Sequence, residues 1–448
     1  RPSSLNVLYS IHLFYKKTLK TASFYEYISM KVEDCYGRLF TKDQVDQEVI
    51  EQAQLLPSMI EEKGKLFCNR CGSQIDLEHW KLQIGSYYCR ACIQLGRIRG
   101  DESLYYFPQV AFPQEEVLNW QGTLTPFQSR VSEALVQSLG QEDPVMVHAV
   151  TGAGKTEMMY HVVAEVIRRG ESVCIATPRI DVCIELYHRM TRDFACPISL
   201  LHGDSEPYFR TPLVIATTHQ LLKFYQAFNL LLIDEVDAFP FVDNAMLYQA
   251  VSNALAKKGK LIYLTATSTK ELDRKVKNKE LKRVSLPRRF HGNPLVVPKK
   301  VWLQDIRRKI EKEQVPRKLL TLIKQQRKTH YPLILFVSEI KLGEKMLRIL
   351  RKLFPNEKLE LVTSKTENRL ELVEGFRNQE ISILLSTTIL ERGVTFPKVD
   401  VFVIEANHRL FTKSALVQIA GRVGRSIERP TGTLLYLSEG TSKDMNDA

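Results

Sequence analysis

The sequence predicts an α/β protein of two tandem lobes, each built on a parallel sheet, preceded by a small four-cysteine ribbon. Short apolar runs alternate twice with helix-length periodic segments, which is typical of parallel strands joined by helices. A proline-rich basic stretch separates the two series, and two Cys-x-x-Cys pairs precede the first series. With 448 residues, the chain has room for two or three domains.

The composition is that of a globular protein, with 44% hydrophobic and 25% charged residues. No apolar run approaches the roughly 18 residues of a membrane-spanning helix. Residues 1–29 carry no clear secretory signal, and we expect them to be disordered or non-native, with Met30 as the natural start. The net charge of +12 is concentrated in residues 270–328, where 20 Lys or Arg face 6 Asp or Glu. We interpret that segment as a surface for nucleic-acid phosphates rather than a solvated helical face.

The expected parts follow one another along the chain. They are an N-terminal extension over 1–64 with a helix over 42–60, a cysteine module over 65–103, lobe 1 over 104–286, a basic linker over 287–300 and lobe 2 over 301–448. Apolar runs predict strands at 145–150, 173–176, 213–216, 230–234 and 261–264 in lobe 1, and at 333–337, 359–362, 381–386 and 399–404 in lobe 2.

A phosphate-binding loop is predicted in lobe 1, between an apolar strand and a helix. Backbone N–H groups in such a loop form an anion nest, and the helix N-terminus adds the positive end of its dipole. We expect Lys155 to reach the β- and γ-phosphates of ATP and Thr156 to coordinate Mg²⁺. The nucleotide-binding candidates are Thr151, Gly152, Ala153, Gly154, Lys155 and Thr156, although Ala149 replaces the first glycine of the plain motif.

Two acids follow another apolar strand of lobe 1. Asp234 and Glu235 come directly after Leu231-Leu232-Ile233, at the carboxyl end of a strand, where the phosphate loop also lies. We expect Asp234 to hold Mg²⁺, and Glu235 to orient and deprotonate the attacking water. The structural alternative is an acidic turn in solvent, which the neighbouring phosphate loop disfavours.

The close cysteine pairs predict a metal site. Cys68 and Cys71 are separated from Cys89 and Cys92 by 17 residues, a spacing that suits four thiolates around one tetrahedral Zn²⁺. Four protein ligands leave no open position, so the predicted role is structural. A redox pair, two disulfides and a [4Fe–4S] cluster are the alternatives. The remaining cysteines, at 35, 174, 183 and 196, are expected to be reduced thiols.

The order of motifs resembles that of superfamily 2 helicases, whose lobes have the RecA-like fold. Gln128, in Leu-Thr-Pro-Phe-Gln, is similar to the glutamine that reads the adenine edge. The resemblance implies nucleic-acid contacts at Pro178, Arg179, Thr217, Thr218 and Thr387, and coupling of hydrolysis to lobe movement through Thr265, Thr267, Arg392 and Gly393. Gln418, Arg422 and Arg425 match the closing arginine motif.

The two arginines of that motif suggest a physical mechanism. A guanidinium brought across a cleft neutralises charge on the transferring phosphoryl group and is typically worth ~10³ to 10⁵ in rate. Arg422 and Arg425 are three residues apart, so on a helix they would share one face. Because they belong to lobe 2, hydrolysis would depend on closure of the lobes.

The position of the ribbon narrows the resemblance. The cysteine pairs before lobe 1, together with Lys65-Leu-Phe-Cys68, Asp234-Glu-Val-Asp-Ala-Phe-Pro240 and Leu286-Pro-Arg-Arg-Phe-His-Gly-Asn-Pro294, are similar to the ComFA family of late-competence ATPases. The resemblance runs from about Met30 to the end of the chain, and the family usually extends somewhat past Ala448. It implies a cytosolic motor at the inner face of the membrane that pulls single-stranded DNA through the uptake channel. The implied partners are the ComEC channel and the phosphoribosyltransferase-like ComFC, and the oligomeric state stays open.

Three other functions compete with this interpretation. A PriA-type replication-restart helicase also binds zinc, but its cysteines interrupt the lobes. A DEAD-box RNA helicase is disfavoured by Val236, where alanine is expected, and by the ribbon. A non-hydrolysing nucleic-acid scaffold is disfavoured because the complete set of ATPase residues is present.

Overall fold

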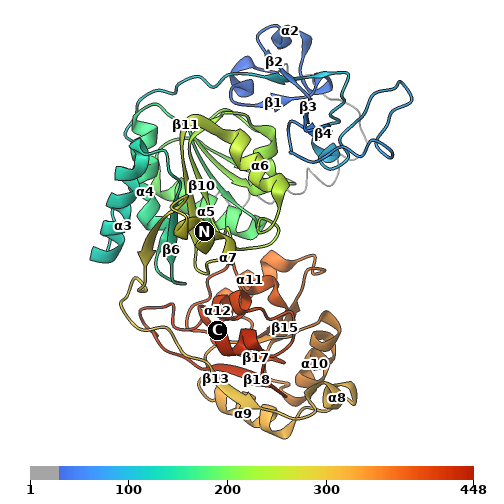
Figure 1. Cartoon of the computed structure of the whole chain (residues 1–448). Coiled ribbons are helices and arrows are strands. Elements are labelled where there is room, and N and C mark those ends of the chain that lie inside the picture. The colour runs from blue at the N-terminus through green and yellow to red at the C-terminus, as the bar shows by residue number, and fades with distance from the viewer. Residues whose placement is uncertain (1–29) are drawn as a thin grey trace, which may run out of the picture.

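The structure, a computed structural model, describes residues 30–448, so the expectations for residues 1–29 lie outside the described residues. Figure 1 shows two α/β lobes, with the N-terminal module beside lobe 1 and lobe 2 on the side of lobe 1 away from that module. Both large sheets contain only parallel pairs, which confirms the predicted fold class.

Lobe 1 is a seven-stranded sheet in the order β12-β6-β11-β10-β7-β9-β8. Its strands are β6 (Val145–Ala149), β7 (Val173–Thr177), β8 (Ile198–Leu201), β9 (Leu213–Thr217), β10 (Phe228–Ile233), β11 (Leu255–Thr265) and β12 (Lys282–Leu286). Its helices are α3 (Pro126–Gln137), α4 (Lys155–Arg168), α5 (Ile180–Asp193), α6 (Ala245–Ala254) and α7 (Lys270–Lys277), with the 3-10 helix η5 (Thr218–Lys223).

The two faces of this sheet are covered by different elements because successive strand residues point to opposite sides. Val147 packs in a buried cluster with α3, α4 and α5, whereas its neighbour Met146 packs in a second cluster with α6 and η5. The phosphate loop and the acids both lie at the carboxyl ends of central strands, at the edge that faces lobe 2.

Lobe 2 is a six-stranded sheet in the order β13-β18-β17-β14-β16-β15. The strands are β13 (Lys299–Trp302), β14 (Leu333–Phe336), β15 (Leu359–Val362), β16 (Ile383–Ser386), β17 (Asp400–Ile404) and β18 (Leu434–Ser438). The helices are α8 (Ile306–Glu311), α9 (Arg317–Arg327), α10 (Ile340–Leu353), α11 (Arg369–Arg377), α12 (Lys413–Ala420) and α13 (Lys443–Asp447).

The N-terminal module contains two small antiparallel sheets. One has the order β1-β5-β2 and the other pairs β3 with β4. The strands are β1 (Leu39–Phe40), β2 (Gln54–Pro57), β3 (Met59–Glu62), β4 (Lys65–Cys68) and β5 (Ser103–Tyr106), with the short helices η1 (Val32–Cys35), η2 (Lys42–Gln44), α2 (Gln47–Ile50) and η3 (Ile93–Leu95). Because β2 pairs with β5 and β3 with β4, residues 30–64 and the cysteine segment form one folded unit.

The helix expected over 42–60 is wrong. Only the single turn of α2 is α-helical there, and β2 and β3 occupy the second half of the segment. Leu55 is paired with Tyr105 and Ile60 with Phe67 across antiparallel strands, so pairing with distant strands overrode the local helical spacing.

Within the described residues, no helix combines the length and the apolar character that crossing a bilayer requires.

Candidate active site and metal centre

A cavity of about 510 Å³ lies between the lobes. The sequence-predicted residues that line it are Gln128, Thr151, Gly152, Ala153, Gly154, Lys155, Thr156, Asp234 and Glu235 from lobe 1, and Arg392, Gly393, Gln418 and Arg425 from lobe 2. The structure therefore brings together residues that lie far apart in the chain, and both lobes contribute to one site.

The phosphate loop has the backbone conformation that its glycines allow. Gly152 and Gly154 have φ values of 76° and 72°, in the left-handed region that favours glycine. A Cβ at Gly154 would lie 2.3 Å from Nε2 of Gln128. That Nε2 donates to Ala153 O at 2.9 Å and to Gly154 O at 3.3 Å, while Oε1 accepts from the Thr125 N–H. Gln128 thus holds the shape of the loop from within the cavity.

The acids after β10 lie beside the loop lysine. Lys155 Nζ is 3.3 Å from Asp234 Oδ1, which also accepts the N–H of Glu235 at 2.9 Å. Glu235 has a φ of 53°, and its buried Oε2 has no hydrogen-bond partner within residues 30–448. Burial raises the pKa of the Glu235 carboxyl above its ordinary value, although Arg392 opposes the shift. A buried carboxylate with a raised pKa and a free oxygen is suited to accept a proton.

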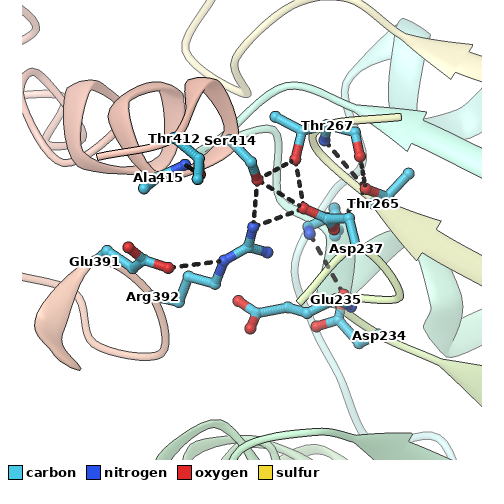
Figure 2. Close-up of polar contacts among 11 residues, drawn as sticks. Asp234, Glu235, Asp237, Thr265, Thr267, Glu391, Arg392, Thr412, Ser414 and Ala415 are labelled. Carbon is cyan, nitrogen blue, oxygen red and sulfur yellow. Dashed lines mark hydrogen bonds and ion pairs between the residues drawn. The ribbon is translucent and has the colours of Figure 1, made fainter. Parts of the chain in front are cut away.

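Asp237, the third acid of the Asp234-Glu-Val-Asp237 string, was assigned no role from the motifs, and it lies at the centre of the network in Figure 2. Its buried carboxylate accepts from Thr265 Oγ1 at 2.6 Å, from Thr267 Oγ1, and from Ser414 Oγ at 3.2 Å. Arg392 Nη2 lies 2.6 Å away, and both side chains of this pair are only 2–3% exposed. Burial would raise the pKa of Asp237, but Arg392 and the hydrogen bonds from Thr265 and Thr267 together outweigh it and lower the pKa to about 2.

That network joins the lobes. Asp237 and the two threonines come from lobe 1, whereas Arg392 and Ser414 come from lobe 2, and Thr267 Oγ1 also lies 2.8 Å from Ser414 Oγ. The signal in the sequence was a third acid within four residues after an apolar strand. The sequence did not indicate that Asp237 would contact Ser414, because Ser414 belongs to no recognised motif.

The closing arginines do not lie on a helix, and the expected shared helical face is wrong. Helix α12 ends at Ala420, and the chain continues in turns through Gly424. Arg425 lines the cavity, donating to Gly421 O at 3.0 Å and to Thr395 Oγ1 at 3.3 Å.

Arg422 is 1% exposed, yet none of its three guanidinium nitrogens has a hydrogen-bond partner among the described residues. Burial, together with Arg425 and Arg179, lowers its pKa well below the usual range, and Glu235 opposes that shift. A buried, unpartnered cation is unfavourable by itself. Arg422 does not itself line the cavity, but Gln418 and Arg425 of the same motif do, so its unused donors point to an anionic ligand.

The residues expected to contact nucleic acid differ in their exposure. Pro178, Thr217 and Thr218 are buried, whereas Arg179 and Thr387 are half-buried. Arg179 Nη2 donates to the main-chain oxygen of Ile389 in the other lobe. Gly393, expected to couple the lobes, faces α5, where a Cβ would meet Val182 at 2.9 Å.

The four predicted metal ligands form one buried cluster. Their Sγ atoms are 3.8 Å apart for Cys68 and Cys92, and 3.6 Å apart for both Cys71–Cys89 and Cys89–Cys92. A tetrahedral ion with ~2.3 Å metal–sulfur bonds requires sulfurs about 3.8 Å apart, so the cluster fits Zn²⁺. All eight cysteines are free, so the structure contains no disulfide between the pairs.

Arg70, inside the first pair, is buried beside the cluster. It donates to Cys92 Sγ at 3.2 Å and to the main-chain oxygens of Cys92, Leu95 and Gly96 at 2.7–2.8 Å. A cation at this position offsets the negative charge of four thiolates and fixes the second pair.

The basic segment 270–328 does not form a single free surface. Arg283 is paired with Asp273, and Arg307 with Glu405. Arg289 is buried. Part of the positive charge is therefore used within the fold, and a nucleic-acid surface over this segment stays a prediction.

Comparison with known families identifies three regions. The model of "Competence protein ComFA N-terminal domain" matches residues 23–106, that of "DEAD/DEAH box helicase" matches 125–274, and that of "Helicase conserved C-terminal domain" matches 312–426. The chain is 61% identical over 420 residues to the competence protein ComFA of Streptococcus pneumoniae, covering 94% of this chain and 97% of that protein. It is 38% identical to ComFA of Bacillus subtilis, covering 86% and 84%.

More distant relatives share the two lobes. The ATP-dependent DNA helicase RecG of Aquifex aeolicus is 26% identical, over 72% of this chain and 43% of that protein. Among solved structures, S. cerevisiae Dbp5 bound to RNA and ADP BeF3 has a TM-score of 0.52 at 16% identity, covering 72% of this chain and 89% of that one. RecG bound to a three-way DNA junction has a TM-score of 0.52 at 19% identity, covering 73% and 44%. These structural similarities describe the fold of the lobes.

Proposed function

From the premise that this chain belongs to the ComFA family of competence proteins, we propose that it is an ATP-driven motor that moves along single-stranded DNA during DNA uptake. The helicase-type domains support ATP as the fuel. The observation that carries the proposal is the composition of the cavity: lobe 1 lines it with a phosphate loop and acids, and lobe 2 lines it with Gln418 and Arg425.

The lobe 1 side has the groups that hold a triphosphate. The N–H groups at the start of α4 and the Lys155 ammonium face the cavity, so they would bind the phosphates. Thr156 and Asp234 offer oxygens for Mg²⁺, which would neutralise charge on the phosphate oxygens. Glu235 would take the proton of the attacking water, because its free, buried oxygen has a raised affinity for protons.

The lobe 2 side would complete the reaction only in the closed arrangement. Arg425 already lines the cavity, and the Arg422 guanidinium, which lies 5.8 Å from the centre of the Phe396 ring, has no hydrogen-bond partner among the described residues, so both would be available for the charge that develops on the γ-phosphoryl group. Asp237 would transmit the state of the nucleotide, since one carboxylate contacts the coupling threonines and the Arg392 guanidinium of the other lobe. Closure and hydrolysis are thereby coupled.

We place the DNA strand across both lobes, on the side where Arg179 and Thr387 are half-buried. The side chains of Pro178, Thr217 and Thr218 are buried, so these residues would support the DNA-contacting surface rather than contact the strand through exposed side chains. Zn²⁺ held by the four cysteines would be structural and fix the N-terminal module. The proposed working place is the inner face of the cell membrane, with ComEC and ComFC as partners; co-purification of ComFC with a tagged chain tests that partnership.

The central test is hydrolysis. We expect the purified chain to hydrolyse ATP, with strong stimulation by circular single-stranded DNA and little by duplex DNA or RNA. Lys155→Ala should remove turnover because the phosphates lose their main cation, while DNA binding stays; Lys258→Ala, at an exposed lysine of the same lobe, is the matched control. Stimulation by RNA instead would assign an RNA helicase, and no hydrolysis at all would assign a scaffold.

A further inference from the structure

One arginine of the linker is buried. Arg289 is only 3% exposed, whereas Arg288 before it and Phe290 after it are exposed. No carboxylate pairs with Arg289 among residues 30–448; its Nε is buried without a partner. Burying a guanidinium is unfavourable unless its donors are used, so its remaining contacts explain why it is there.

Those contacts are main-chain oxygens of the arginine turn, residues 421–425. Arg289 Nη1 donates to Val423 O at 2.8 Å and to Gly424 O at 2.6 Å, and Nη2 donates to Gly421 O at 3.4 Å. Helix α12 has ended at Ala420, so the carbonyls of the turn have no helical partners. A guanidinium at this place satisfies them and also opposes the negative end of the helix dipole.

The same segment of the linker also contacts the phosphate loop. The Phe290 N–H donates to Gly152 O at 3.3 Å, and His291 Nε2 donates to Gly424 O at 3.1 Å. A Cβ added at Gly152 would meet Arg289 Nε, Cδ and Cγ at 3.6–3.7 Å. Three consecutive residues therefore contact the loop of lobe 1 and the turn of lobe 2 together.

The two loops also touch directly, with no space to spare. A Cβ at Gly421 would lie 2.1 Å from Thr151 Oγ1, so the main chain of the turn packs against the phosphate loop. Burial and the neighbouring Arg425 lower the pKa of Arg289 to about 10, so it stays charged at neutral pH. Arg425 Nε donates to the same Gly421 O at 3.0 Å, so the two arginines meet at one carbonyl, and Arg425 lines the cavity.

We propose that Arg289 is a positioning residue for ATP hydrolysis: it seats the arginine turn on the phosphate loop, so that Arg422 and Arg425 face the γ-phosphate. This rests on the proposed function. The linker is then a working part of the active site, because one side chain fixes the distance between the two halves of the site at their closest approach.

The test is a comparison of Arg289→Met with wild type at saturating single-stranded DNA. We expect kcat to fall about 10- to 100-fold, as for a misplacement of about 1 Å. The KM for ATP and the affinity for a fluorescent ATP analogue should change by less than about threefold, because lobe 1 holds the phosphates. Arg289→Lys should keep only part of the wild-type kcat, because an ammonium lacks the planar set of N–H donors with which the guanidinium contacts three carbonyls. Arg288→Met, at the exposed neighbour, is the matched control.

A double variant separates positioning from general stability. If Arg289 acts by positioning Arg422, Arg289→Met should add little further loss in kcat when Arg422→Ala is already present. Losses that simply multiply would overturn the proposal, as would a folded Arg289→Met chain with normal kcat. A parallel fall in melting temperature and nucleotide affinity would assign Arg289 a purely structural role. A wild-type chain that does not hydrolyse ATP would instead refute the proposed function itself.

Discussion

The two interfaces of lobe 1 are held by different forces. The N-terminal module shares one buried apolar cluster with lobe 1, which includes Cys68 and Ile98 on one side and Phe224 and Ala250 on the other. No buried apolar cluster of the described residues spans the cleft to lobe 2. The contacts across that cleft include the pairs Arg392–Asp237, Thr267–Ser414 and Arg369–Asp181.

This difference predicts that the interface between the lobes opens and that the interface with the N-terminal module does not. Water replaces a lost hydrogen bond at small net change in free energy, whereas exposing apolar surface is unfavourable by about 25 cal/mol per Å². The module should therefore move with lobe 1 as one body, and lobe 2 should move against both. Figure 1 shows the module on the side of lobe 1 away from lobe 2.

The largest expected effect is on the interface between the N-terminal module and lobe 1, which we call the permanent interface. Cys89→Ser should remove about one equivalent of zinc, and structural zinc binding is typically worth ~10 to 16 kcal/mol. Because the cysteines belong to the same buried cluster as α6 and η5, the melting temperature of lobe 1 should fall as well. Metal analysis and calorimetry check both.

A matched control is Cys196→Ser, which alters a buried thiol outside the cluster. It should keep the metal and shift the melting temperature less. If Cys89→Ser lost the metal and left the main melting transition unchanged, the module would be an independent domain, and the contrast between the interfaces would disappear.

The next largest effect is expected at the interface between lobe 1 and lobe 2. Asp237→Asn removes the charge that faces Arg392, and we expect DNA-stimulated kcat to fall about 10²- to 10³-fold, because the catalytic groups lose their alignment. Breaking a buried ion pair usually destabilises a fold by about 3–5 kcal/mol. Here the lobes can part and water can reach Arg392, so the melting temperature should change little. Small-angle scattering should show a larger radius of gyration.

The control for that variant is Asp243→Asn, at an exposed acid of the same loop with a φ of 58° that asparagine tolerates. It should leave both kcat and the radius of gyration unchanged. A large loss of melting temperature in Asp237→Asn with normal kcat per folded molecule would show that the cleft interface is as permanent as the other.

The sequence predicted the parallel lobes because buried parallel strands are apolar along their whole length, as in Leu333–Phe336, where every residue is buried. It missed β12 and β13, because Lys282–Leu286 and Lys299–Trp302 lie at the sheet edges and carry several exposed residues. It also missed the edge strand β8 and the fully buried strand β18, to which that reason does not apply. Motif spacing likewise predicted the phosphate loop, the acids and the lobe 2 residues that line the cavity, but it did not predict lining residues such as Glu185, Arg189 and Thr395.

Sequence reasoning could not predict the contacts between motifs. Arg289 counts as one more positive charge in a basic linker, and nothing local reveals that its acceptors are carbonyls of residues 421–424. These acceptors are main-chain oxygens, which every residue has, so no pattern of residue types predicts them. Asp237 was visible as an acid, but its partners come from separate segments of both lobes.

A smaller effect tests the hydrogen bonds of the permanent interface. Asn253 of α6 donates from Nδ2 to Asn69 O at 3.0 Å and to Arg70 O at 3.1 Å, so it ties lobe 1 to the first cysteine pair. Asn253→Ala should lower the free energy of unfolding by about 1–3 kcal/mol, since two partly buried main-chain carbonyls lose their donor. Denaturant unfolding measures it, with the exposed Asn278→Ala as control. A neutral result would mean that apolar burial alone holds the module.

The last effect is a shift in pH dependence, and it reports on closure of the cleft. Glu235 must be ionised to act as a base, and burial raises its pKa, so kcat/KM should fall with decreasing pH at a higher pH than the ordinary glutamate value of about 4.3. Burial also raises the pKa of Glu391, so Glu391→Gln is needed to show that the acid limb belongs to Glu235. In Asp237→Asn the parted lobes should hydrate Glu235, and the acid limb should move down toward the ordinary value. An unchanged limb in that variant would mean that lobe 1 alone buries the base, and that closure acts through the arginines only.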